Sequence, residues 1–223
     1  MDPAQKYGFF CDLDAAAKET TAALTRANIR HGFMGGYATS LIGGSRMTQD
    51  VDVIVDSDPN EARSVLLQAN ARFTITPSNK LVFPGRNDTS IAVELLRGGE
   101  GKQLKLPDAK MISLRPITPN GLPGRVEETP SEYLCVLLEP AFAFIADSAR
   151  PVSIIKAERG FEDIQVILTW LGNDGSLIDF EGYPEKPKHE LLALVRKLYQ
   201  MHTAIRPLLA VTLSADDLAL ISN

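Results

Sequence analysis

The chain has 223 residues, of which 44% are hydrophobic and 23% charged, and its 23 Lys and Arg against 28 Asp and Glu give a formal net charge of −5. This composition is ordinary for a globular protein and argues against a disordered chain, a collagen-like repeat or a coiled-coil rod. At roughly 150 residues per domain, the length predicts one medium domain with a large appendage, or two small domains. The slight excess of acids argues against a nucleic-acid coat protein, which usually carries a basic face.

The first half of the chain predicts helices and strands in alternation. Residues 12–28 are Ala-rich with apolar positions at steps of three and four, which indicates a helix. An apolar strand at 29–34 then ends at Gly35-Gly36, and a short helix at 37–42 ends at Gly43-Gly44. The remaining predicted elements are a strand at 51–55, a helix from Asp58-Pro59 to Ala69, strands at 72–76, 80–83 and 91–96, a loop at 97–110 and a strand at 111–117.

The second half is predicted to be mostly helical, with helices near 141–148, 161–171, 189–203 and 215–221. Turn-forming residues at 118–124 mark the expected seam between the two halves. We therefore expect an α/β domain over residues 1–124 and a mostly helical domain over residues 125–223. Because the strands cluster and helices follow them, the fold class is α+β.

Nothing in the sequence indicates secretion or a membrane partner. Its two cysteines, Cys11 and Cys135, are far apart and outside any Cys/His cluster, so we expect reduced thiols and no zinc site of common spacing. The first residues lack the basic and then apolar pattern of a signal peptide, and no run of about eighteen apolar residues is present. We expect a cytoplasmic protein.

Two aspartates on one predicted strand are the main chemical signal. Side chains at i and i+2 of a strand point to the same face, so Asp50 and Asp52 would project together while Val51 and Val53 enter the core. Two like charges so placed repel each other unless a cation lies between them. Carboxylate oxygens suit Mg²⁺, which proteins usually hold with a few carboxylates and the phosphates of a substrate.

Glu94 is a candidate third carboxylate. It is the single charge in the apolar strand 91–96, where burial would be costly unless the acid were paired or bound a metal. If this strand lies beside the aspartate strand, Glu94 joins the same cluster. Three carboxylates can hold two metal ions about 4 Å apart, an arrangement suited to in-line displacement at phosphorus.

Gly35 and Gly36 stand between a strand and a short helix, where glycine lets a phosphate approach the backbone. The chain has no GxxxxGK[ST] loop of the Walker A type.

Taken in order, these motifs resemble a known family. An apolar strand, Gly35-Gly36, a helix, the strand Arg46-Met-Thr-Gln-Asp-Val-Asp52 and a later apolar-Glu-apolar strand are similar to the polymerase-β-type nucleotidyltransferase superfamily. The spelling is most similar to the small-molecule and AbiEii-toxin-like branches and to uncharacterised fungal members. The likeness covers roughly residues 29–96 and extends faintly to residues 162–168, where Asp163 is interpreted as a helix-surface acid.

The resemblance implies a role for each site residue. Asp50 and Asp52 would be metal ligands, and Glu94 would be the third ligand or a base. Gly35, Gly36 and Tyr37 would meet the nucleotide phosphates, and Arg46 would contact a phosphate or orient the aspartate strand. Where the family often has Gly-Ser, this chain has Gly-Gly-Tyr, so the phosphate contact would be made by backbone alone. The family's helix lysine has no counterpart at 141–150, and Lys156 or Arg159 would substitute.

The implied function is that of a nucleotidyltransferase of the EC 2.7.7 type. With Mg²⁺ or Mn²⁺, it would transfer a nucleoside monophosphate from an NTP, in the first instance ATP, to a hydroxyl or phosphate of a small molecule and release pyrophosphate. The helical half would shape the acceptor pocket. Two alternatives stay open: toxin-like modification of tRNA or protein, which the net charge of −5 disfavours for tRNA, and a binding module of the same fold without turnover.

Overall fold

The computed structural model describes residues 3–45, 47–86, 88–102, 106–117, 133–135, 151–180, 183 and 186–222. In chain order the elements are α1 (Pro3–Arg26), β1 (His31–Met34), α2 (Gly35–Leu41), β2 (Asp50–Val55), α3 (Pro59–Ala69), β3 (Thr74–Ile75), β4 (Leu81–Pro84), β5 (Ser90–Leu96), β6 (Arg115–Ile117), β7 (Tyr133–Cys135), α5 (Pro151–Asp174), α6 (Lys188–Met201), the 3₁₀ turn η1 (Thr203–Ile205), α7 (Arg206–Thr212) and α8 (Ala215–Ser222). The expected seam at 118–124 and helix at 141–148 lie outside the described residues.

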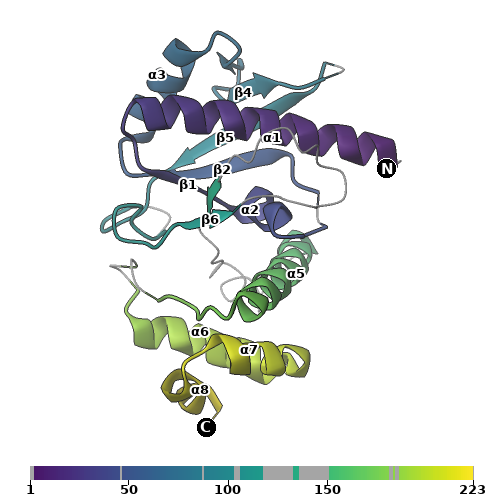
Figure 1. The fold of residues 1–223 in the computed structure, drawn as a ribbon, viewed down its shortest axis with the longest axis vertical. Helices are drawn as coiled ribbons and strands as arrows, with labels where there is room; N and C mark the ends of the chain where they lie inside the picture. Colours follow the sequence, from purple (N-terminus) through teal and green to yellow (C-terminus); the bar gives the residue numbers. More distant parts are fainter. Residues whose placement is uncertain are drawn as a thin grey trace.

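The described strands form one mixed sheet in the order β3-β4-β5-β2-β1-β7-β6. β2 pairs antiparallel with β1 and parallel with β5, while β7 pairs parallel with β1. In Figure 1, α1 lies across one face of this sheet, and α5 leads down to a layer formed by α6, α7 and α8. The α+β fold with a helical C-terminal half is thus confirmed.

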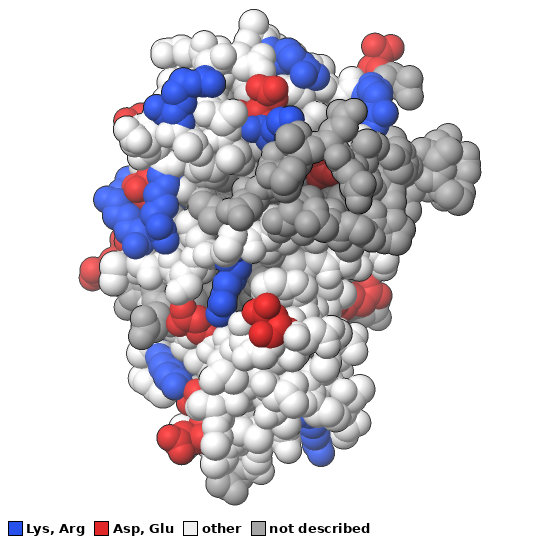
Figure 2. Space-filling view, viewed as in Figure 1, with Lys and Arg blue, Asp and Glu red and all other residues white. Residues whose placement is uncertain are grey.

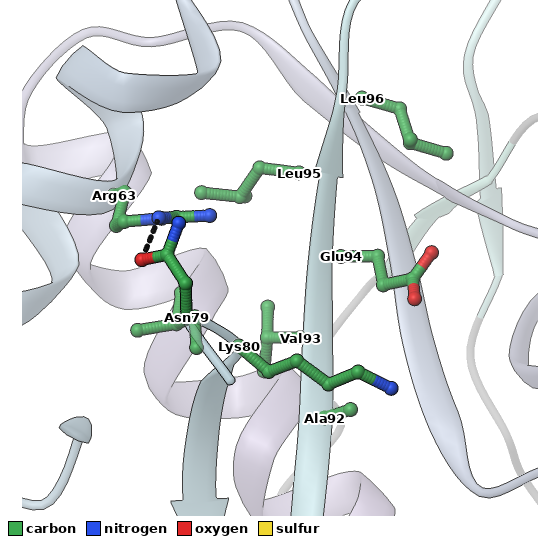
Figure 3. A pocket seen from close by; sticks show the side chains of 9 residues that line it. Arg63, Asn79, Lys80, Ala92, Val93, Glu94, Leu95 and Leu96 are labelled. Atoms are coloured by element: carbon green, nitrogen blue, oxygen red, sulfur yellow. Dashed lines mark hydrogen bonds between the residues drawn. The ribbon is translucent and has the colours of Figure 1, made fainter. Parts of the chain in front are cut away.

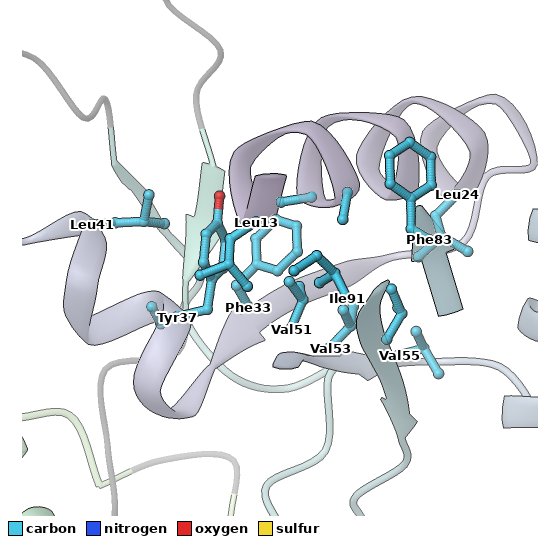
Figure 4. Packing of buried hydrophobic residues seen from close by; sticks show 14 of the residues in the cluster. Leu13, Leu24, Phe33, Tyr37, Leu41, Val51, Val53, Val55, Phe83 and Ile91 are labelled. Carbon is cyan, nitrogen blue, oxygen red and sulfur yellow. The ribbon is translucent and has the colours of Figure 1, made fainter. Parts of the chain in front are cut away.

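The main core lies between α1 and the sheet, and strand alternation explains its composition. Val51, Val53 and Val55 are fully buried on one face of β2, as their period of two predicts. They pack with Leu13 and Leu24 of α1 and with apolar side chains of β1, β4 and β5 (Figure 4). The opposite face of β2 carries Asp50, Asp52 and Ile54, and Ile54 is buried there in a smaller cluster with Ala109 and Ile112.

Local signals set several helix boundaries. Asp58 caps α3, because its side chain accepts a hydrogen bond from the backbone N–H of Asn60 at 2.8 Å, and Pro59 occupies the first turn. α5 ends at Asp174. Gly175 follows with φ +69°, and the N–H of Ser176 bonds to the carbonyl of Leu171 at 2.9 Å. α1, in contrast, begins at Pro3 rather than at the predicted Asp12.

The C-terminal helices enclose a second core, and α5 belongs to both cores. Ile167 and Leu171 of α5 pack into the main core, whereas the neighbouring Leu168 packs into the second one. The second core otherwise consists of Leu192, Leu198, Ile205, Leu209, Leu213 and Ile221. None of the described helices is long and apolar enough to cross a membrane.

The structure also contains elements that the sequence did not predict. β7 lies after the expected boundary at residue 124, yet it is a strand of the main sheet and pairs with both β1 and β6. α7 was not predicted either, although α6 and α8 agree with the predicted helices at 189–203 and 215–221 within two residues.

Candidate active site

The register of the sheet brings the two acidic strands side by side, which is the condition under which Glu94 joins the aspartates. β2 and β5 are parallel neighbours, with Asp52 paired with Glu94 and Asp50 paired with Ala92. On the other side, Asp52 pairs with Met34, the last residue of β1. Because paired residues on adjacent strands share a face, Asp50, Asp52 and Glu94 all lie on the face opposite the main core.

Asp52 lies directly against the start of α2. Gly35 has φ +63°, and a Cβ added to it would lie 2.5 Å from Oδ2 of Asp52. No real Cβ sits that close to an oxygen, so the carboxylate can approach the backbone here only because residue 35 is a glycine. The Gly-Gly motif and the aspartate strand of the sequence are therefore in direct contact in the structure.

Asp50, the first residue of β2, is oriented by a threonine that lies two residues before it. The hydroxyl of Thr48 donates to Oδ1 of Asp50 at 2.6 Å, and Thr48 itself is buried. This hydrogen bond fixes the direction of the Asp50 carboxylate. The sequence analysis assigned Thr48 no role of its own; a hydroxyl two residues before an acid on a strand is the signal that could have identified it.

Glu94 is exposed, although its apolar neighbours in sequence pointed to burial. The buried neighbours, Ile91 and Val93, face the main core, whereas Glu94 points to the other side of β5. Its carboxylate is therefore open to a ligand and needs no partner to offset burial.

The phenol of Tyr37 is not offered to a ligand. Its side chain is fully buried, its ring packs edge-on against Phe33, and its hydroxyl donates to Oδ1 of Asp14 at 2.9 Å. Any contact of Tyr37 with a nucleotide would have to involve its backbone. Arg46 lies outside the described residues, as do the side chains of Lys156 and Arg159.

Asp163 is not the surface acid that the sequence indicated. It is only 2% exposed on α5, on the same helix face as Ile167 and Leu171, which enter the main core. The spacing of these three residues, four positions apart, is the helical signal that could have placed it.

Whether a metal ion could bind here depends on the three carboxylates and on how their strands are paired. In the part of the chain that the structure describes, no three His, Cys, Asp or Glu side chains converge into a ready-made site. Asp50, Asp52 and Glu94 nevertheless share one face, and adjacent strands are only about 4.8 Å apart. Carboxylate oxygens are the donors that a hard divalent cation such as Mg²⁺ prefers.

Charges of both signs are interspersed over the described residues of the face shown in Figure 2, and no basic band crosses it. Such a band would be the electrostatic footprint of nucleic-acid binding. The arrangement agrees with the formal net charge of −5.

No protein-family model and no curated protein matches the chain. Among solved structures, an antigenic nucleotidyltransferase-like protein from Paracoccidioides brasiliensis is similar at 17% identity and a TM-score of 0.63, covering 95% of this chain and 97% of that one. ANT(2")-Ia in complex with adenylyl-2"-tobramycin is more remote, at 15% identity, a TM-score of 0.41 and coverage of 82% and 97%. The lincomycin-bound lincosamide adenylyltransferase LnuA is similar at 10% identity and a TM-score of 0.31, with coverage of 65% and 89%.

The first of these likenesses extends over nearly the whole of both chains. The protein therefore has an α+β fold of the nucleotidyltransferase type, as the motifs predicted.

Proposed function

We propose that the protein transfers a nucleoside monophosphate from an NTP to a hydroxyl or phosphate of a small molecule. The observation that carries this proposal is the pairing of Asp52 with Glu94 on adjacent parallel strands, with Gly35 directly against Asp52. The shared fold with a nucleotidyltransferase-like protein supports it.

Each residue has a definite task in this reaction. Gly35 and Gly36 lack side chains, so the phosphates can approach the backbone beside Asp52. The acceptor oxygen forms a bond to the α-phosphorus as the bond to the bridging oxygen breaks, and pyrophosphate leaves. When the acceptor is a hydroxyl, Glu94 accepts its proton, for which the exposed position of this carboxylate is suited.

Asp50, Asp52 and Glu94 would hold Mg²⁺ or Mn²⁺, with Thr48 orienting Asp50. A divalent cation supplies charge neutralisation at the triphosphate and at the attacking oxygen. A small-molecule acceptor is favoured over tRNA, because a chain with a formal net charge of −5 attracts a polyanion poorly.

The proposal is tested by following pyrophosphate release. The protein is incubated with each NTP, Mg²⁺ or Mn²⁺ and a pool of metabolites, and ATP is tried first. We expect release that Asp50→Asn and Asp52→Asn each reduce by at least about a hundredfold, since each removes a charge from the proposed site. Asp58→Asn is the matched control, because it makes the same change just after β2 and asparagine still caps α3.

Release that is unaffected by both site variants would overturn the assigned site. Calorimetry separates the remaining alternative: binding of an NTP with metal but without turnover identifies a non-catalytic module, and no nucleotide binding at all contradicts both interpretations.

A further inference from the structure

A pocket of about 220 Å³ lies beside Glu94 and is absent from the sequence predictions. Its walls are Arg63 of α3, Asn79 and Lys80 of the β3–β4 turn, and the last residues of β5 (Figure 3). It exists because β4 begins only at Leu81, so that β5 from Glu94 onward extends past the end of its neighbour. Part of the β5 edge therefore faces the pocket.

Lys80 lies in line with the carboxylates. The β4–β5 register pairs Pro84 with Ser90 and Val82 with Ala92, and its continuation brings Lys80 opposite Glu94. Strand alternation gives Lys80 the same face as Glu94. Figure 3 shows the Lys80 side chain crossing β5 toward the side on which Glu94 projects. One row across the sheet thus contains Asp52, Glu94 and Lys80.

The position of Lys80 is fixed by a tight turn. Its N–H bonds to the hydroxyl of Thr76 at 3.0 Å and its carbonyl accepts from the N–H of Thr76 at 2.9 Å. Asn79 adopts φ +61°, a conformation that asparagine tolerates better than most residues. The Asn79 side chain in turn accepts from Nη1 of Arg63 at 3.2 Å. That bond holds the guanidinium on the side of β5 away from Glu94, where α3 packs on the main core.

The order of the row places two substrates on opposite sides of Asp52. Gly35 and the proposed phosphate contact lie on the β1 side, and Glu94 and then Lys80 lie on the other side. Lys80 is two strands from Asp52, or about 10 Å. A nucleotide whose phosphates lie against Gly35 leaves the pocket beside Glu94 to the second substrate.

We propose that the acceptor binds on the Glu94 side of this pocket, and that it carries an anionic group, a phosphate or a carboxylate, which Lys80 binds. This inference rests on the proposed function. Two of the lining residues are cations and one, Glu94, is an acid. Arginine and lysine are the side chains that bind phosphate and carboxylate groups most strongly.

The binding half of the inference is tested without any NTP. Backbone amide shifts are recorded by NMR as D-ribose 5-phosphate, D-ribose or tobramycin is added. We expect shifts at residues 79–81 and 93–96 with ribose 5-phosphate only. Lys80→Gln should weaken this binding about tenfold, the usual effect of losing a charge-assisted hydrogen bond. Arg63→Gln, on the other side of β5, should not weaken it. Lys80→Arg should retain it.

The matched control is Lys18→Gln, which removes an exposed lysine from α1 on the opposite face of the sheet and should change nothing. Equal shifts from ribose and ribose 5-phosphate, tobramycin binding at the same amides, or full affinity in Lys80→Gln would each overturn the anionic pocket.

The acceptor half is tested by turnover. A metabolite pool is separated by ion exchange into anionic, neutral and cationic fractions, and we expect only the anionic fraction to stimulate pyrophosphate release. In Lys80→Gln the KM for the acceptor should rise while the KM for the NTP is unchanged. Stimulation by the neutral or cationic fraction overturns this assignment. If ribose 5-phosphate binds but no fraction supports turnover, the pocket binds anions. In that case both its acceptor role and the proposed function are overturned.

Discussion

Gly35 is the residue at which the proposed site tolerates least change. In Gly35→Ala the new Cβ would have to displace the Asp52 carboxylate, and the residue would also be strained at φ +63°. We expect pyrophosphate release to fall at least about tenfold and the free energy of unfolding to fall by about 2–3 kcal/mol, the sum of strain and overpacking. Both are measurable, the second by urea titration.

Gly175→Ala is its matched control. Gly175 has a similar φ of +69°, but nothing lies within 4 Å of an added Cβ. This variant should lose about 1 kcal/mol of stability from backbone strain alone and should release pyrophosphate normally. If the two variants lost activity equally, close contact between Gly35 and Asp52 would not be the cause.

A substitution of Tyr37 tests whether the side chain of this residue, which follows Gly35-Gly36, contacts the nucleotide. Tyr37→Phe removes the hydrogen bond to Asp14 and leaves the buried ring in place. We expect the free energy of unfolding to fall by about 1–2 kcal/mol, because a charge-assisted hydrogen bond is lost. Nucleotide affinity by calorimetry should not change. Weakened nucleotide binding at unchanged stability would show that the phenol reaches the ligand after all.

At the scale of elements, an ion pair joins α6 and α8 beside the second core. Nζ of Lys188 lies 2.8 Å from Oδ1 of Asp217, which is buried. Burial by itself raises the pKa of Asp217, but hydrogen bonds from Lys188 and Ser214 and the charge of the lysine outweigh it and hold the pKa below its ordinary value. A carboxylate with a lowered pKa in the folded state stabilises the protein at neutral pH.

This stabilisation is complete above the pKa of Asp217 in the unfolded chain, near 3.9, and is lost as the pH falls through the lowered folded value. Asp217→Asn should therefore lower the urea midpoint at pH 7, and the difference from the parent protein should shrink as the pH falls below about 4. Asp216→Asn, an exposed neighbour in the same helix turn, is the control. A deficit of Asp217→Asn that persisted undiminished in acid would contradict the ion pair as its cause.

Elements with strong local signals were predicted to within a residue or two. β2 has β-branched residues at 51, 53, 54 and 55, and α3 has both a capping aspartate and a proline in its first turn. β7 was missed because its three residues are too few to show alternation, and it is held by pairing with β1 and β6 instead. The predicted start of α1 was too late, because the apolar periodicity is clear only from Asp12. Pro3, at the first turn, is the signal that marks the true start.

The site was predictable where it depends on sequence order and not where it depends on distant contacts. The alternation that brings Asp50 and Asp52 to one face is local, and the pairing with Glu94 needed only that two strands be adjacent. Other features depend on which elements cover which face of the sheet. These are the exposure of Glu94, the burial of Tyr37 and Asp163, and the alignment of Lys80 with Glu94. Residues near each position in the sequence do not show which distant element will pack against it.

At the scale of the whole molecule, α5 joins the two cores. Ile167 and Leu168 are adjacent, yet the first packs into the main core and the second into the C-terminal core. α5 cannot leave one core without disturbing the other. We therefore expect the molecule to unfold in a single cooperative transition, even though the turn-rich segment at 118–124 divides its sequence into two halves.

Leu168→Ala is the decisive variant. It should cost about 2–5 kcal/mol, the usual effect of truncating a buried leucine, and should shift the whole transition. Two probes report on it: circular dichroism follows all helices, and fluorescence follows Trp170, the single tryptophan, which packs against the main core. We expect both probes to give the same lowered midpoint. If Leu168→Ala shifted the dichroism while the Trp170 midpoint stayed in place, the two halves would unfold independently and α5 would not couple them.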